Sequence, residues 1–197
     1  IDDEFPFSFE PTDSIRLQDL FAVLRNHNEG TKYDGSENYT KGNPHEFDRA
    51  ICASTTQYGF VAQLREDMPK ELAYVMWLAP FRPCVHPFTQ WYFGISEIPD
   101  RYATGTWQSA LETHFEPIED LDKHAPGHAF LQYVDEAKAI DTSYLERIEE
   151  INTNIEMFEE AVIKKQPVIE ERILNLYKKD REQAIKAITV FSTKELK

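Results

Sequence analysis

The chain lacks the features that would place it at once in several large protein classes. Its two cysteines, Cys52 and Cys84, are too few for a disulfide framework, and they show no metal-binding spacing. No apolar run approaches the roughly 18 residues of a membrane helix. No signal peptide is evident, but a chain that begins with Ile1 gives no information on a leader. Location therefore stays open between a periplasmic or secreted protein and a cytoplasmic one, in a bacterium.

Basic charge is also scarce. The 197 residues contain 21 Lys and Arg against 35 Asp and Glu, a formal net charge of -14. This balance argues against nucleic acid and against an anionic membrane surface as partners. Hydrophobic residues make up 41% of the chain and aromatic residues 13%, enough for a real core. The length fits one domain or half of a larger one.

Strand and helix patterns follow one another, which predicts an α+β chain. Residues 1–105 carry an extended arm, a helix and inner strands, and they end in a rim rich in proline and aromatic residues at 79–105. Residues 106–197 are expected to form a helical region packed on that first part. Short connections make the strands antiparallel neighbours. The expected helices are 15–27, 106–115, 128–140, 141–164, 168–178 and one capped by Asp180, with Pro167 kinking or restarting the chain. The expected strands are 48–55, 58–65 and 72–78, the last buried on both faces.

Two arginines in the strand region are candidates for chemistry. Arg49 and Arg65 lie in or at the end of expected inner strands, where a buried guanidinium needs a compensating partner. A structural ion pair is one explanation, and Glu29, Asp34 and Glu46 flank the preceding loop as possible partners. Contact with a substrate carboxylate, or support of an oxyanion, is the other.

Cysteine and histidine patterns are weaker. Cys84 and His86 could be drawn as a thiolate pair, but a packed cysteine beside a rim histidine explains them better. Cys52 in an expected apolar strand is most simply a core residue. His124 and His128 are spaced for a helical metal site, but the intervening Pro-Gly spoils that geometry. We therefore expect no metal and no cofactor, and local patterns alone reveal no nucleophile–base pair.

An ordered series of segments resembles a known family. These are LRNHNEGTKYD (24–34), Arg49-Ala50-Ile51, FVAQLREDMP (60–69), the strand with Trp77, PFTQWYFGISEIPDRYATG (87–105) and LNLYKKDREQAIKAITVFS (174–192). Together they are similar to the cysteine dipeptidases, family sixty-nine of the cysteine peptidases, in the N-terminal-nucleophile hydrolase superfamily, which are relatives of the secernins. The resemblance spans nearly the whole chain.

The resemblance implies an αββα sandwich that hydrolyses dipeptides through an N-terminal cysteine. Both cysteines here are internal, so the chain would be the C-terminal part of the enzyme, with the nucleophile in a missing N-terminal half. Arg49, and Arg65 second, would support the nucleophile. Trp77, Trp91 and Tyr92 would line the substrate pocket.

Two other functions are compatible with the resemblance. One is a non-catalytic homologue that acts as a binding or interaction module. The other is an amide hydrolase on the same fold with a non-peptide substrate. In each case half a sandwich would expose its inner sheet, so we expect the chain to be poorly soluble, to form a homo-oligomer or to pair with the missing half.

Overall fold

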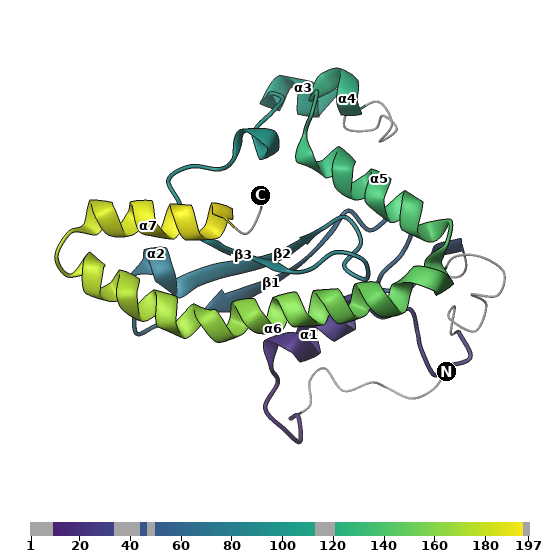
Figure 1. The fold of residues 1–197 in the computed structure, drawn as a ribbon, viewed down its shortest axis with the longest axis horizontal. Coiled ribbons are helices and arrows are strands. Elements are labelled where there is room, and N and C mark those ends of the chain that lie inside the picture. The colour runs from purple at the N-terminus through teal and green to yellow at the C-terminus, as the bar shows by residue number, and fades with distance from the viewer. Residues whose placement is uncertain (1–9, 34–43, 47–49, 113–120, 195–197) are drawn as a thin grey trace.

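The computed structural model describes residues 10–33, 44–46, 50–112 and 121–194. They form an α+β fold with a small antiparallel sheet and a helical C-terminal region (Figure 1). None of its described helices combines the length and the apolar character needed to cross a membrane. The strands are β1 (Tyr58–Leu64), β2 (Tyr74–Pro80) and β3 (Thr89–Tyr92). The helices are α1 (Leu17–Leu24), η2 (Pro44–Glu46), α2 (Lys70–Ala73), η3 (Asp100–Tyr102), α3 (Trp107–Glu112), α4 (Leu121–His124), α5 (Ala129–Asp141), α6 (Tyr144–Tyr177) and α7 (Arg181–Lys194).

The sheet has the order β1-β2-β3, and both pairs are antiparallel. Val61 lies opposite Trp77, and Val75 lies opposite Tyr92. The prediction that the strands near 58–65 and 72–78 are antiparallel neighbours is thus confirmed. Side chains alternate between two faces along each strand, as the period of two requires.

Three helices cover one face of the sheet. In Figure 1, α6 crosses the strands as the long green helix, with α1 and α7 beside it. The core between them includes Phe21 of α1, Trp77 of β2, Val162 of α6 and Ile188 of α7. Phe21 stacks on Phe88 with ring centroids 4.1 Å apart. Burial of such large apolar side chains is the main force that joins the helices to the sheet.

The opposite face of the sheet is apolar but exposed. Leu64 is 71% exposed and Phe93, just after β3, is 77% exposed. Side chains of β1, β2 and β3 line a shallow hollow of about 690 Å³ there. The expectation that the strand around 72–78 is buried on both faces is therefore wrong within the described residues. The strand is apolar as expected, but no element among the described residues covers its second face.

The first expected strand, 48–55, is wrong for residues 50–55. The backbone turns there, because the Ala53 N–H donates to the Thr56 hydroxyl at 2.9 Å and the Thr56 N–H donates to the Ala53 carbonyl at 3.0 Å. Short hydroxyl-bearing residues favour such turns over a strand. Residues 47–49 lie outside the described part. The strand expected at 72–78 begins only at Tyr74, because the one-turn helix α2 starts after Pro69 and includes residues 72 and 73.

The rim at 79–105 and the helix around Pro167 also differ from the expectation. The expected loop rim contains β3, a strand of only four residues between Phe88 and Phe93. Helix α6 continues through Pro167 over 34 residues instead of restarting there, since its buried face packs on the sheet on both sides of the proline. Asp180 caps α7 as expected, because its carboxylate accepts the Gln183 N–H at 3.0 Å.

Candidate functional site

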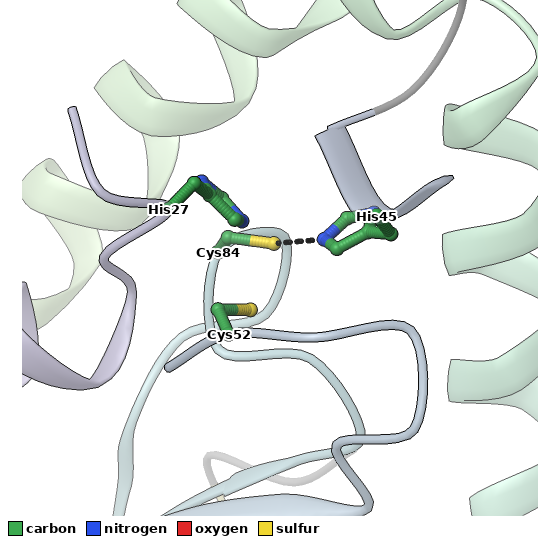
Figure 2. Close-up of side chains that lie close together, drawn as sticks. All are labelled: His27, His45, Cys52 and Cys84. Atoms are coloured by element: carbon green, nitrogen blue, oxygen red, sulfur yellow. Dashed lines mark hydrogen bonds between the residues drawn. The ribbon is translucent and has the colours of Figure 1, made fainter. Parts of the chain in front are cut away.

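Four buried side chains with metal-ligand chemistry converge at one end of the sheet. They are His27 after α1, His45 in η2, Cys52 in the turn before β1, and Cys84 in the loop after β2 (Figure 2). One ligand atom from each lies within 4.8 Å of the other three. The His45 Nε2 lies 3.4 Å from the Cys84 Sγ.

Local backbone geometry places these side chains. Asn28 adopts a left-handed φ of 67°, which asparagine tolerates well, and this turns the chain sharply after His27. The Cys52 N–H donates to the Asn26 carbonyl at 3.1 Å and so brings the two segments together. Phe81 has a φ of 57°, unusual for a bulky residue, at the point where the chain leaves β2 towards Cys84.

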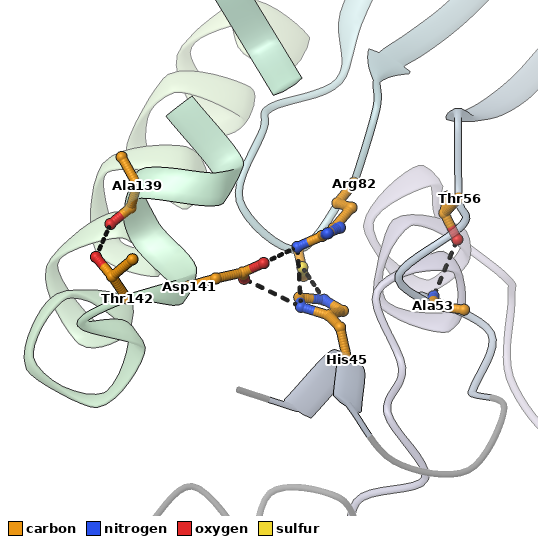
Figure 3. Close-up of polar contacts among 8 residues, drawn as sticks. His45, Ala53, Thr56, Arg82, Ala139, Asp141 and Thr142 are labelled. Atoms are coloured by element: carbon orange, nitrogen blue, oxygen red, sulfur yellow. Dashed lines mark hydrogen bonds and ion pairs between the residues drawn. The ribbon is translucent and has the colours of Figure 1, made fainter. Parts of the chain in front are cut away.

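Carboxylates lie behind both imidazoles. The His27 Nδ1 is 3.1 Å from Glu29 Oε1, and the His45 Nδ1 is 3.2 Å from Asp141 Oδ1. Asp141 also forms a short ion pair with the buried Arg82 (Figure 3). The His27 Nε2 is buried and has no hydrogen-bond partner among the residues that the structure describes.

The two thiols differ in their protonation. The pKa of Cys52 is lowered, because Cys84 donates a hydrogen bond to it and both His27 and His45 add to the effect against the cost of burial. The same bond and burial raise the pKa of Cys84. The pair therefore favours one thiolate, and thiolate is the form in which cysteine attacks a carbonyl or binds a metal.

A cleft of about 600 Å³ opens beside this cluster, and His27 and Cys84 belong to its lining. Arg25 and Glu159 form its wall. Both guanidinium Nη atoms of Arg25 donate to the Glu159 carboxylate, at 3.0 and 2.5 Å. The Phe88 N–H donates to the same carboxylate at 2.7 Å. This network joins α1, α6 and the start of β3 beside the cluster.

Two residues predicted for the site meet at another buried carboxylate. Arg65 Nη1 donates to Glu170 Oε2 at 2.7 Å, and the Tyr92 hydroxyl donates to Glu170 Oε1 at 2.6 Å. Arg65 Nη2 also donates to the Leu72 carbonyl at 2.5 Å. Burial and Glu170 raise the pKa of Tyr92. The partner of Arg65 is thus Glu170 of α6, and the suggestion of a partner from the loop near 29–46 is wrong for this arginine.

The remaining predicted residues are dispersed. Trp77 is fully buried on the covered face, where its indole Nε1 donates to Gln63 at 3.3 Å. Trp91 lies on the exposed face and contacts Tyr102 edge to face at 5.7 Å. Arg49 lies outside the described residues. The catalytic and substrate-binding roles of these residues, and of Arg65 and Tyr92, stay predictions.

The possible thiolate pair of Cys84 with His86 does not form, and Cys84 contacts His45 instead. His86 instead faces Glu136, with 3.7 Å between Nε2 and the carboxylate, and burial lowers its pKa to about 4. His128 caps α5, accepting the Phe130 N–H at Nδ1, while His124 ends α4. Sequence reasoning missed the role of His27 and the meeting of His45 with both cysteines, because no local spacing reveals contacts made across loops.

Comparison with known proteins agrees with the resemblance drawn from the sequence. The model of peptidase family C69 matches residues 1–120. A probable dipeptidase B of Lactococcus lactis subsp. lactis is 30% identical over 99 residues, which are 50% of this chain and 21% of the relative. A probable dipeptidase of Salmonella dublin is 30% identical over 91 residues, which are 46% of this chain and 20% of the relative.

The family match covers more than half of the chain, so the chain belongs to peptidase family C69. The family is one of peptidases, and both relatives are named as probable dipeptidases. The matched part of the chain spans only about a fifth of each relative's length.

Proposed function

We propose that this chain is the C-terminal part of a cysteine dipeptidase whose N-terminal nucleophile lies outside residues 1–197. Membership of peptidase family C69 is the observation that carries the proposal. In this mechanism the N-terminal thiol attacks the scissile carbonyl, and the free α-amino group of the same cysteine accepts the thiol proton. The leaving amine departs as one amino acid, and water then hydrolyses the thioester to release the other.

The exposed sheet face supports the idea of a missing half. An αββα sandwich packs two sheets face to face, so each inner face must be apolar. Leu64, Met76, Trp91 and Phe93 form such a face here, and they are exposed or only half-buried. Exposed apolar areas of this kind mark interaction surfaces. We assign this face to the second sheet of the same protein, since the relatives extend far beyond the matched region.

The candidate residues lie at different places on the sheet, and we therefore propose different roles for them. Trp91 lies on the face that would meet the second sheet, so it can contact a substrate held between the sheets. Trp77 and Tyr92 are buried on the covered face, at 0% and 1% exposure, where packing accounts for them. Arg65 is held by Glu170, so it can act on the reaction only through the position of the sheet. Arg49 remains the proposed support for developing negative charge.

Hydrolysis assays on the full-length protein test the proposal. A panel of dipeptides, longer peptides and non-peptide amides should show turnover of dipeptides first. Arg49→Ala should reduce dipeptide turnover by roughly 100-fold with the fold unchanged, if Arg49 supports the oxyanion. Arg65→Ala is the matched comparison, and it should lower thermal stability and turnover together. Activity on non-peptide amides alone would favour the other amide hydrolase, and no turnover of any amide would favour a binding module.

A further inference from the structure

The cluster of His27, His45, Cys52 and Cys84 has the composition of a metal centre. Two sulfurs and two imidazole nitrogens approach one another within 4.8 Å, and all four side chains are buried. We propose that these four residues form a tetrahedral zinc site. The proposal does not depend on dipeptidase activity, because it concerns residues apart from the proposed nucleophile.

The distances are close to those that zinc requires. Zn–S bonds of about 2.3 Å and Zn–N bonds of about 2.0–2.1 Å place tetrahedral ligands roughly 3.3–3.8 Å apart. The His45 Nε2 and the Cys84 Sγ are already 3.4 Å apart. The largest separation allowed within the set, 4.8 Å, shortens to this range if side chains shift by about 1 Å. Figure 2 shows both rings and both sulfurs turned towards a common centre.

The imidazoles are oriented as in protein zinc sites. A metal-bound histidine usually passes its other ring N–H to a carboxylate or a carbonyl, which fixes the ring and its tautomer. Glu29 occupies this position for His27, and Asp141 occupies it for His45, whose Nδ1 also lies 3.2 Å from Arg82 Nη1. Both Nε2 atoms are left to face the thiols. A buried nitrogen without a hydrogen-bond partner, such as the His27 Nε2, is costly unless a ligand binds it.

The chemistry of the donors selects the metal. Thiolate and imidazole ligands suit zinc and copper(I) rather than magnesium or calcium, and a set of two cysteines and two histidines is a common structural zinc site. Two thiolates would balance the charge of Zn²⁺, while Arg82 and Asp141 beside them neutralise each other. Four protein ligands in a buried position leave no coordination position for a substrate. The site would therefore act as a structural clip that joins the end of α1, η2, the turn before β1 and the loop after β2.

Metal analysis of the full chain, with any sequence that precedes Ile1 retained, tests the site. We expect zinc in about equimolar amount after purification in zinc-containing medium. Replacement by Co²⁺ should give the visible d–d absorption of a tetrahedral site and a thiolate charge-transfer band. Cys52→Ser and Cys84→Ser should each lose the metal. His128→Asn is the matched control, since it removes a histidine outside the cluster and asparagine preserves the helix cap.

A second readout covers variants that fail to fold. In the wild-type chain, alkylation of the peptides that contain Cys52 and Cys84 should be slow with metal bound and should accelerate after chelation. Folded wild-type protein that binds neither Zn²⁺ nor Co²⁺ would overturn the proposal. A cobalt spectrum that both cysteine variants retain would overturn it as well, and so would a native disulfide between Cys52 and Cys84.

Discussion

Removal of the Glu159 carboxylate should destabilise the protein strongly. Glu159 is 3% exposed and accepts two hydrogen bonds from Arg25 and one from the Phe88 N–H. Glu159→Ala leaves the largely buried Arg25 guanidinium without its carboxylate, with the bond from Nε to the Pro83 carbonyl still in place, and leaves the buried Phe88 N–H without this acceptor. Loss of one member of a buried ion pair costs about 3–5 kcal/mol. For a chain of this size, each kcal/mol corresponds to about 2–4 °C in melting temperature, so we expect a decrease of about 6–20 °C.

Urea unfolding followed by circular dichroism measures this effect. Glu160→Ala, at the exposed neighbouring position on α6, is the control and should change the free energy of unfolding by less than about 0.5 kcal/mol. Combining Glu159→Met with Arg25→Met should recover part of the loss, because no buried charge then remains unpaired. A cost below about 1 kcal/mol for Glu159→Ala would refute the assignment of this network as a buried ion pair.

Three other perturbations follow from the fold. Leu64→Lys with Phe93→Lys should make the isolated 197-residue chain more monomeric in sedimentation but weaken its association with the preceding half, and no change in either would contradict the proposed role of this face. The Glu71 backbone N–H and Arg181 lower the pKa of the Glu71 carboxyl, so its stabilising effect is full above the unfolded-state pKa and disappears as the pH falls through the lowered value. Glu71→Gln should thus reduce stability at pH 7 and flatten the acid side of a stability profile, and parallel profiles would be evidence against the pair. Gly94→Ala places a Cβ against the Glu71 side chain and 2.7 Å from the Glu71 carbonyl. We expect the free energy of unfolding in urea to fall by about 1–3 kcal/mol. An unchanged urea midpoint would show that α2 can shift away from the new Cβ without cost.

Sequence patterns correctly predicted the helices and strands whose structure depends mainly on residues close by in the chain. The pattern in 58–65, the apolar run 72–78 and the short connection between them predicted an antiparallel pair, and Asp180 predicted the start of α7. The strand expected at 48–55 failed because hydrogen bonds between Ala53 and Thr56 form a turn. Periodicity could not reveal this competition between side-chain and backbone hydrogen bonding.

The candidate site was beyond the reach of local patterns. His27, His45, Cys52 and Cys84 come from four separate segments, and contacts such as the bond from Cys52 to Asn26 bring them together. No short spacing records these contacts. The sequence indicated Arg65 as a cation in need of a partner, and the partly buried guanidinium pairs with Glu170, more than a hundred residues away. Side chains that pair across tertiary contacts can be identified as candidates from sequence, whereas their partners cannot.

We propose that a cysteine at the mature N-terminus of the full-length protein is the nucleophile. The most direct test is mass spectrometry of the full-length protein after inactivation by a thiol-alkylating reagent, with dipeptide turnover followed in parallel. We expect one alkyl group on an N-terminal cysteine to abolish dipeptide hydrolysis, and excess dipeptide to protect this residue. A mature N-terminus without cysteine, or undiminished turnover after alkylation of an N-terminal cysteine, would show that another group is the nucleophile.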